Sequence, residues 1–264
     1  MKNVRWNMVL VLLVVICASG LAAAEEITIV GTGSGTAILQ AIADAFSREN
    51  PDVTIILPES IGSGGGIKAV GRDEYLLGRV ARDIQEKEKP YGLTYLPYAK
   101  IPIVFYVNKS VTLKDLSAQQ ILDIYSGKIT NWKEVGGDDL NVRVITREEG
   151  DSSQTILLDS FPGFKDITIT PKAKTTFSDP ETEEAVVNTP QVIAYGPYSN
   201  VKLLDVNILT IDGKSPTEAD YPYVGPAGLI YKAANYTGNI KKFVEFVTSE
   251  AADEVIKEAG GIPF

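Results

Sequence analysis

One segment near the start of the chain strongly restricts its fold. Residues 27–30 form a short apolar run typical of a buried strand, and residues 37–46 carry apolar side chains at helical spacing. A second β-prone run at residues 53–57 follows the turn Glu-Asn-Pro-Asp. The order strand, glycine-rich loop, helix, strand predicts a parallel α/β sheet, because parallel strands need a crossover connection and a helix provides it.

The same order recurs in the second half of the chain. A strand is expected at residues 142–146, followed by a small-residue loop at 147–155 and a helix over 156–161. We therefore expect an α/β fold with two similar lobes facing one another across a cleft, each lobe a mainly parallel sheet with helices on both faces. The predicted lobes are residues 25–104 with 224–264, and residues 105–223.

Two extended runs, residues 101–108 and 196–226, are expected to carry the chain between the lobes. A long amphipathic helix is expected at residues 239–259, where apolar side chains recur at helical spacing. The remaining expected elements are a helix near Gly65, a helix from the cap Ser117 through Tyr125, a helix at 181–188 and a strand at 192–196.

The N-terminus has the pattern of a secretory signal peptide. Lys2 and Arg5 precede an apolar run from Met8 to Ala18, and the small residues 22–24 provide a cleavage site. We expect cleavage after Ala24 and export to the periplasm or the cell surface. Attachment of an uncleaved N-terminus to the membrane, or through Cys17 as a lipoprotein, remains the alternative; the bulky Ile16 disfavours the lipoprotein.

Composition excludes several kinds of chemistry. The chain has no histidine, and its one cysteine lies in the predicted signal, so a Ser-His-Asp triad, a cysteine nucleophile or a zinc site of the usual ligands cannot form in the mature protein. Removal of Lys2 and Arg5 leaves 23 basic against 34 acidic residues, a formal net charge of −11. This charge disfavours nucleic acid and anionic membranes as partners. We expect no metal, no cofactor and no catalysis.

Three small-residue loops have the composition of anion sites. They read GTGSGT at residues 31–36, GSGGGIK at 62–68 and REEGDSSQT at 147–155. Unpaired N–H groups and the helix dipole favour an anion at a helix start, and glycine lets the backbone approach closely. The third loop adds Arg147, whose guanidinium can bind an oxyanion through two hydrogen bonds. Any single loop could be an ordinary strand-to-helix turn; the recurrence favours binding.

Enzymatic patterns fit less well. A dinucleotide-binding loop needs a third glycine where this chain has Thr36, and no phosphate-binding loop of the Walker type is present. Paired carboxylates occur at 148–149, 138–139 and 183–184. Such pairs are found in glycosidases, but neighbours in sequence are more often solvated surface, and we expect that here.

The segment LSAQQILDIYSGKITNWKEVGG at residues 116–137 closely resembles the periplasmic phosphate-binding proteins of ABC transporters, the PstS-like family of type 2 periplasmic binding proteins. GSGGGIK, TPQVIAYG at 189–196 and the C-terminal segment 243–264 resemble the same family. The resemblance implies a monomeric two-lobed protein that binds one phosphate and delivers it to an ABC permease. The residues it assigns to phosphate are Ser34, Gly35, Thr36, Ser63 and Arg147. We expect Ser152 and Ser153 of the third loop to join them, and Tyr125 and Trp132 to be packing residues.

Two positions depart from the family pattern. Asp151 stands where a hydroxyl donor is expected, and the family's acidic acceptor of the phosphate proton falls on Ala81. We expect Asp151 to take over this acceptor role, which would favour protonated phosphate over sulfate; the alternative is that Asp151 only caps the following helix. Of the cations beside Ala81, Arg79 is expected at the surface, whereas Arg82 is expected to face the cleft and bind the ligand.

The resemblance leaves three functional hypotheses open. A non-catalytic protein that binds phosphate is the first, with another oxyanion as a variant of it. A sensor or adhesion module that keeps the fold is the second. An exported hydrolase is the third, and it is weakened by the absence of histidine and of a cysteine in the mature chain.

Overall fold

The computed structural model describes residues 24–264 except residue 219. The predicted signal peptide, including Cys17, lies outside the described residues apart from Ala24. Within the described part of the chain, none of the helices combines the length and apolar character needed to span a membrane.

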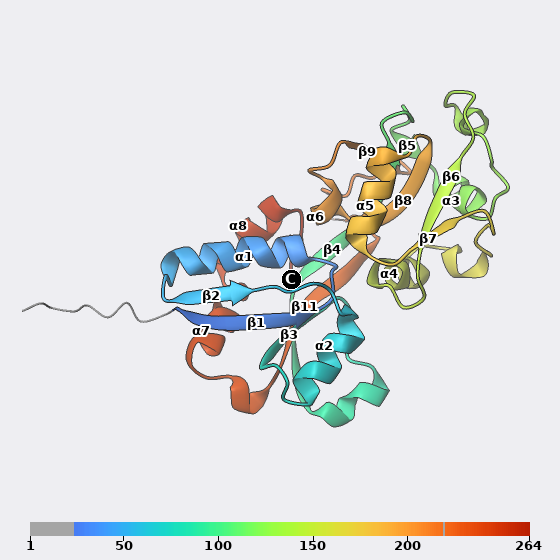
Figure 1. The fold of residues 1–264 in the computed structure, drawn as a ribbon. Coiled ribbons are helices and arrows are strands. Elements are labelled where there is room, and N and C mark those ends of the chain that lie inside the picture. The colour runs from blue at the N-terminus through green and yellow to red at the C-terminus, as the bar shows by residue number, and fades with distance from the viewer. Residues whose placement is uncertain (1–23, 219) are drawn as a thin grey trace, which may run out of the picture.

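Helices and strands alternate along most of the chain (Figure 1). The strands are β1 (Glu25–Gly31), β2 (Val53–Ile56), β3 (Leu77–Val80), β4 (Leu93–Asn108), β5 (Asp115–Leu116), β6 (Arg143–Arg147), β7 (Lys174–Thr176), β8 (Val192–Pro197), β9 (Val206–Ile208), β10 (Thr210–Ile211), β11 (Val224–Lys232) and β12 (Ile262–Pro263). The α-helices are α1 (Thr36–Glu49), α2 (Gly62–Gly71), α3 (Ala118–Tyr125), α4 (Ser152–Ser160), α5 (Asp179–Asn188), α6 (Tyr198–Val201), α7 (Gly238–Val247) and α8 (Glu250–Ala259). Short 3-10 helices cover Glu86–Tyr91, Trp132–Val135, Phe164–Asp166 and Ala233–Asn235.

One sheet runs through both halves of the molecule in the order β2-β1-β3-β11-β4-β8-β6-β7, with β12 and β9 also paired to β4. Strands β1, β2 and β3 are parallel in lobe 1, and β6, β7 and β8 are parallel in lobe 2. The strands at the centre, β11 and β4, pair antiparallel with their neighbours. The expected α/β fold with two mainly parallel lobes is confirmed, and Figure 1 shows the two bodies joined through β4 and β11.

Strand β4 belongs to both lobes. Its first part pairs with β11 up to Pro102, and from Ile103 onward it pairs with β8. Every residue of β4 from Ile101 to Asn108 is buried. The prediction of a β-strand at residues 101–108 is therefore confirmed, but the strand begins earlier, at Leu93, because β11 continues the hydrogen-bonded ladder in that direction.

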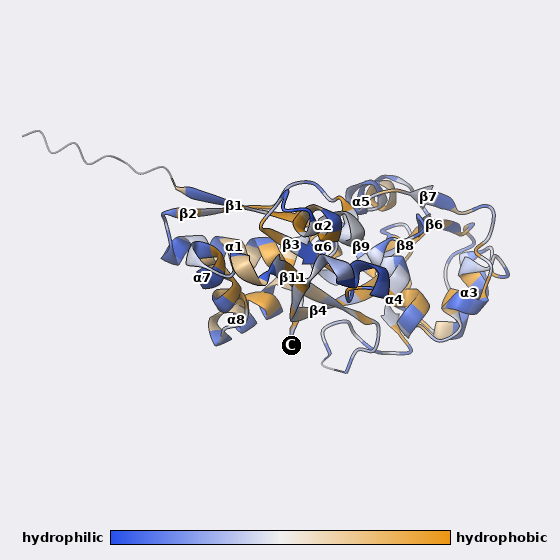
Figure 2. Cartoon of the chain, turned by 90° about the horizontal axis from the view of Figure 1, so that it is seen from below, coloured by the Kyte–Doolittle hydropathy of each residue, from blue (hydrophilic) through white to orange (hydrophobic). Residues whose placement is uncertain are grey.

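The core continues from one lobe into the other. In lobe 1 Phe46 of α1 packs edge-on against Phe243 of α7, with ring centroids 5.2 Å apart. In lobe 2 Phe105 of β4 packs against Tyr125 with centroids 5.5 Å apart. Tyr125 and Trp132 are fully or almost fully buried, which confirms that both are packing residues. Figure 2 shows hydrophobic residues along β3, β4 and β11 and mixed hydrophobic and hydrophilic faces on α1, α7 and α8.

The prediction of a single long helix at residues 239–259 was wrong. The chain forms two helices there, α7 and α8, and the break lies at Thr248 and Ser249. The hydroxyl of Ser249 donates to the Phe246 carbonyl oxygen at 2.7 Å, and the hydroxyl of Thr248 donates to carbonyl oxygens of α7. Hydroxyl side chains that bond nearby backbone in this way compete with helix continuation.

Helix α2 packs directly on β1 at Gly66, which generates a stability prediction. A methyl group on Gly66 would lie 2.8 Å from the Gly31 Cα, a backbone atom that cannot easily move away. We expect Gly66→Ala to lower the free energy of unfolding by about 1–3 kcal/mol in urea denaturation. Gly64→Ala in the same helix is the control, because its methyl group meets nothing closer than 3.5 Å. Equal stability of the two variants would contradict the prediction.

Candidate anion-binding site

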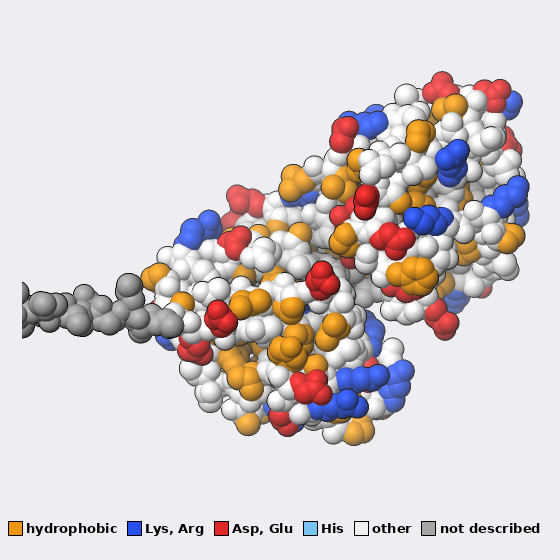
Figure 3. Space-filling model, in the orientation of Figure 1, with side chains coloured by type: hydrophobic (Ala, Val, Ile, Leu, Met, Phe, Trp, Pro, Cys, Tyr) orange, Lys and Arg blue, Asp and Glu red, His pale blue; other side chains and the backbone are white. Residues whose placement is uncertain are grey.

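A cleft of about 1040 Å³ lies between the lobes and is lined by both of them. Its walls are the loops that follow the carboxyl ends of β1, β2, β6 and β7, and these loops lead into α1, α2, α4 and α5. Ligands of α/β proteins commonly bind outside the carboxyl ends of parallel strands. The helix starts direct free N–H groups and the positive ends of their dipoles toward the cleft from both sides. Figure 3 shows the hollow between the two bodies.

The cleft brings together part of the predicted ligand set. Ser34, Thr36, Arg147, Asp151 and Ser152 line it, and they come from both lobes. The remaining predicted residues lie outside its lining: Gly35, Ser63, Arg82 and Ser153. Gly35 is nevertheless needed there, because it precedes α1 with a left-handed φ of 76° that a glycine adopts without strain.

Thr32, which was not among the predicted site residues, connects the two lobes across the cleft. Its Oγ1 lies 3.1 Å from the Oγ of Ser152, at the start of α4 in the opposite lobe. The same Oγ1 accepts a hydrogen bond from the Ser34 backbone N–H at 3.2 Å. Thr32 is 3% exposed. The glycine-rich loop of lobe 1 and the helix start of lobe 2 therefore meet through hydroxyl groups.

Arg147 is buried at the end of β6 and is surrounded by carboxylates. Its Nη2 lies 3.0 Å from Asp151 Oδ2, and its Nη1 bonds Asp179 at the start of α5. Its Nε donates to Glu148 Oε2 at 3.1 Å. Burying a guanidinium without partners is costly, and these carboxylates compensate its charge. Asp179 was not among the predicted site residues, because the helix was expected to begin only at residue 181 and the sequence does not show what its start faces.

Asp151 has the geometry of a helix cap and also pairs with Arg147. Its Oδ1 accepts a hydrogen bond from the Gln154 backbone N–H at 2.9 Å, and it is the N-cap residue of α4. The cap bond that the alternative reading named is therefore present, and the acceptor role stays a prediction. Burial raises the pKa of Asp151 to about 6, against the opposing effect of Arg147. Burial also raises the pKa of Asp179, the other buried carboxyl at Arg147.

The expectation that Arg79 is a surface cation was wrong. Arg79 is 3% exposed, and its guanidinium donates to the carbonyl oxygens of Thr32 at 2.7 Å, Pro58 at 2.6 Å and Ile29. The reason is its position on β3 beside β1, from which the side chain reaches beneath the glycine-rich loop. Arg79 thus fixes the backbone on the lobe 1 side of the cleft, and its donors are used by the protein itself.

Arg82 does not reach the cleft. Its two terminal nitrogens each lie 2.8 Å from a carboxylate oxygen of Glu88, a pairing that holds the guanidinium over α2. Ser63 is also used internally, because its Oγ accepts the backbone N–H of Ala81 at 3.1 Å. This bond ties the start of α2 to the loop after β3.

Ser153 is fully buried in the first turn of α4, and its Oγ has no hydrogen-bond partner among the residues that the structure describes. Buried hydroxyl groups are rarely left unpaired, so each case calls for an explanation. Ser153 directly follows Ser152, which lines the cleft. Its hydroxyl is therefore a free donor close to the helix start.

The paired carboxylates are only partly at the surface. Glu149, Glu184, Asp138 and Asp139 are exposed as expected, but Glu148 and Glu183 line the cleft. The expectation of solvated surface was wrong for these two because the loop after β6 and helix α5 both border the cleft. In the described residues, no group of three or more histidine, cysteine or acidic side chains is placed to hold a metal ion.

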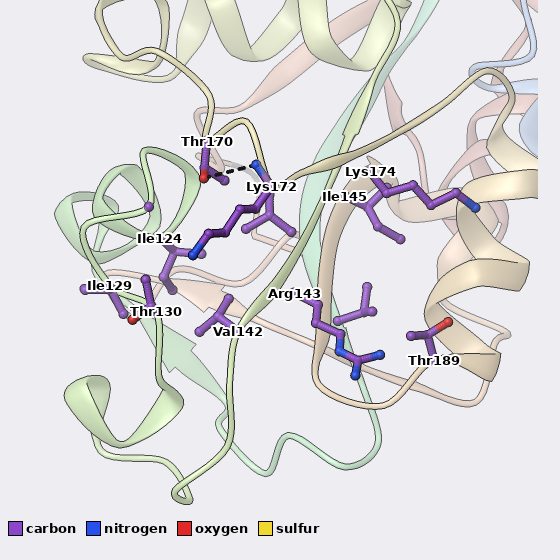
Figure 4. Close-up of a pocket in the computed structure, with 13 residues that line it drawn as sticks. Ile124, Ile129, Thr130, Val142, Arg143, Ile145, Thr170, Lys172, Lys174 and Thr189 are labelled. Carbon is purple, nitrogen blue, oxygen red and sulfur yellow. Dashed lines mark hydrogen bonds between the residues drawn. The ribbon is translucent and has the colours of Figure 1, made fainter.

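A second cavity of about 330 Å³ lies in lobe 2 beside β6 and β7 (Figure 4). Figure 4 shows mainly aliphatic side chains around it, with Arg143, Lys172 and Lys174 at its border. It contains none of the predicted ligand residues and no helix start. The interlobe cleft is therefore the candidate site.

The raised pKa of Asp151 generates a prediction about pH. The folded state binds this proton more tightly than the unfolded state, whose carboxyl has the ordinary value of 3.8, so Asp151 lowers the free energy of unfolding as pH rises through this interval. We expect the stability of the wild type relative to Asp151→Asn to fall by about 1–3 kcal/mol between about pH 4 and about pH 7. Urea denaturation of both proteins measures this, and parallel pH profiles would contradict it.

Comparisons with known proteins agree with this architecture. A family model described as the PBP superfamily domain matches residues 18–251. The phosphate-binding protein PstS of Bacillus subtilis is 27% identical, over 91% of this chain and 81% of its own length.

Solved structures are similar as well. A phosphate ABC transporter substrate-binding protein from Clostridium perfringens, solved with bound phosphate, is 29% identical with a TM-score of 0.80, over 91% of this chain and all of that one. An ABC-type phosphate transport receptor from Vibrio cholerae shares the fold at 24% identity, with a TM-score of 0.65 over 89% of this chain and 99% of its own. The chain belongs to the PBP superfamily, and within it the protein is similar to the PstS-type phosphate-binding proteins.

Proposed function

We propose that this protein captures inorganic phosphate in the interlobe cleft and delivers it to an ABC permease. One observation carries the proposal: helix starts from opposite lobes meet beside a buried arginine, where Thr32 and Ser152 lie 3.1 Å apart. Helix starts and an arginine are the usual protein groups for an oxyanion. The similarity to PstS of Bacillus subtilis and to the phosphate-bound structure from Clostridium perfringens supports phosphate as that oxyanion.

The proposed ligand set follows the geometry. It contains the hydroxyl groups of Ser34, Thr36, Ser152 and Ser153, the guanidinium of Arg147 and the backbone N–H groups at Gly35 and its neighbours. Arg82 is left out, because Glu88 already engages its guanidinium, and Ser63 is left out, because it lies outside the cleft lining and its Oγ ties the start of α2 to the loop after β3. Asp151 is the proposed acceptor for the proton that phosphate carries near neutral pH and sulfate lacks, which would favour phosphate.

Capture requires the lobes to move. Residues 25–104 with 224–264 and residues 105–223 form the two proposed rigid bodies, and β4 and β11 connect them. The first crossing is the extended strand β4, whereas the expected extended run 196–226 contains α6 and turns and leads into β11 only at Val224. A small change of backbone angles near Pro102 and Val224 can rotate one lobe relative to the other. Ligand that contacts both walls stabilises the closed state.

The proposed location is outside the cytoplasm, in accordance with the predicted signal peptide and with the PstS relatives. The chain is proposed to act as a monomer without cofactor or catalysis, as the resemblance to the phosphate-binding proteins implies. A sensor with the same fold would bind phosphate without a permease, so the presence of permease and ATPase genes beside its own gene favours transport over sensing.

Ser153 provides the test of the binding site. Its Oγ has no partner within the described chain, so Ser153→Ala removes no protein hydrogen bond. If the hydroxyl donates to phosphate, the variant should bind phosphate about tenfold more weakly, because a hydrogen bond to a charged group contributes about 1.5 kcal/mol. The free energy of unfolding without phosphate should change by less than about 0.5 kcal/mol. Isothermal titration calorimetry and urea denaturation measure the two quantities.

Ser160→Ala is the matched control, because its hydroxyl lies in the same helix and donates to the Ile156 carbonyl oxygen at 2.7 Å, away from the cleft. We expect Ser160→Ala to lower the free energy of unfolding slightly and to leave the phosphate affinity unchanged. Unchanged phosphate affinity in Ser153→Ala would exclude Ser153 from the ligand set. Absence of measurable phosphate binding by the wild type would contradict the proposed function itself.

A further inference from the structure

Three N–H groups of Arg147 donate hydrogen bonds to carboxylates of the protein, and Asp151 adds an ion pair at Nη2. A guanidinium has five N–H groups arranged as a planar fork. The Nε–Nη2 edge bonds both carboxylate oxygens of Glu148, at 3.1 and 3.3 Å. The other edge holds Asp151 through Nη2, at 3.0 Å, and Asp179 through Nη1. Neither edge is open to an oxyanion that binds through two oxygens, so such a ligand must displace a carboxylate.

Two of the three carboxylates are fixed in place. Asp151 is buried and its second oxygen caps α4 through the Gln154 N–H. Asp179 is buried at the start of α5 and lies against the glycine-rich loop, since a Cβ built on Gly33 would be 3.2 Å from its Oδ2. Moving either of them would disturb a helix start or the contact between the lobes.

Glu148 differs from these two in its surroundings. Its side chain is 30% exposed and lines the cleft, which at about 1040 Å³ has room for a carboxylate to turn into water. In the described part of the chain, its carboxylate has hydrogen bonds only with Arg147. Its backbone is held by the bond from its N–H to the Thr176 carbonyl oxygen, so the side chain can rotate while the loop stays in place.

We propose that Glu148 is an internal competitor for Arg147, whose carboxylate occupies the Nε–Nη2 edge in the free protein and leaves it when the oxyanion binds there. This inference rests on the proposed function. Glu148 keeps the buried guanidinium paired until the ligand arrives, and it lowers the affinity by the free energy of the contact that must break. A carboxylate and an oxyanion with two available oxygens fit the same fork, which makes the exchange geometrically direct.

The test compares phosphate affinities by isothermal titration calorimetry. Glu148→Gln keeps the size of the side chain and removes its charge, so phosphate should bind about five- to tenfold more tightly than to the wild type. Glu149→Gln is the matched control, because this neighbouring residue is exposed and does not line the cleft. It removes the same charge and should change the affinity by less than about twofold.

A second background separates competition from a general charge effect. Arg147→Lys keeps the positive charge but removes the fork. In the Arg147→Lys background, Glu148→Gln should increase the phosphate affinity by no more than Glu149→Gln does. A gain that persists with lysine would overturn the inference in favour of simple repulsion.

The remaining outcomes are also decisive. If the wild type binds phosphate and Glu148→Gln binds it equally or more weakly, the inference fails while the proposed function stands. If neither protein binds phosphate, the proposed function fails and the inference fails with it.

Discussion

The backbone hydrogen bonding of β4 is the constraint on which the rest of the molecule depends. This strand pairs with β11 and β12 in lobe 1 and with β8 and β9 in lobe 2. Its residues from Ile101 to Asn108 are buried, so their N–H and C=O groups need partners within the protein. The two lobes are consequently built on one strand, and the loops at the carboxyl ends of their parallel strands face each other across a cleft.

Charge in this cleft is balanced locally. The described lining contains Arg79 and Arg147 among several carboxylates, and the guanidinium of Arg79 is bonded to backbone carbonyl oxygens. An acidic protein can hold an anion here because helix dipoles and hydroxyl groups act at short range, where the overall charge of the chain has little influence. Three carboxylates stabilise the buried Arg147 in the free protein, and Glu148 is the one proposed to compete with the ligand for it.

Local sequence patterns predicted helices and strands well where residues close together in the sequence determine the structure. The capping motif at Ser117 and the apolar spacing in residues 37–46 specify α3 and α1, because the hydrogen bonds and contacts concerned lie within a few residues. The C-terminal helix was predicted as one piece, since its apolar stripe continues through the break. The hydroxyl groups of Thr248 and Ser249 bond backbone carbonyl oxygens at the end of α7. The spacing of apolar residues carries no information about these bonds, so it did not predict the break.

The sequence by itself determined the fold class, the small-residue loops and Arg147 as the cation of the third loop, because glycine, hydroxyl and helix-start preferences act on adjacent residues. Only the tertiary structure decided what those residues face. Thr32 and Ser152 are 120 positions apart yet 3.1 Å from each other, and Arg79 became a support of the first loop. Asp179, at the start of α5, reaches Arg147 at the end of β6. These contacts depend on how the strands of the two lobes pair on either side of β4. That arrangement results from packing between distant segments, and the order of residues along the chain does not show which distant segments will meet.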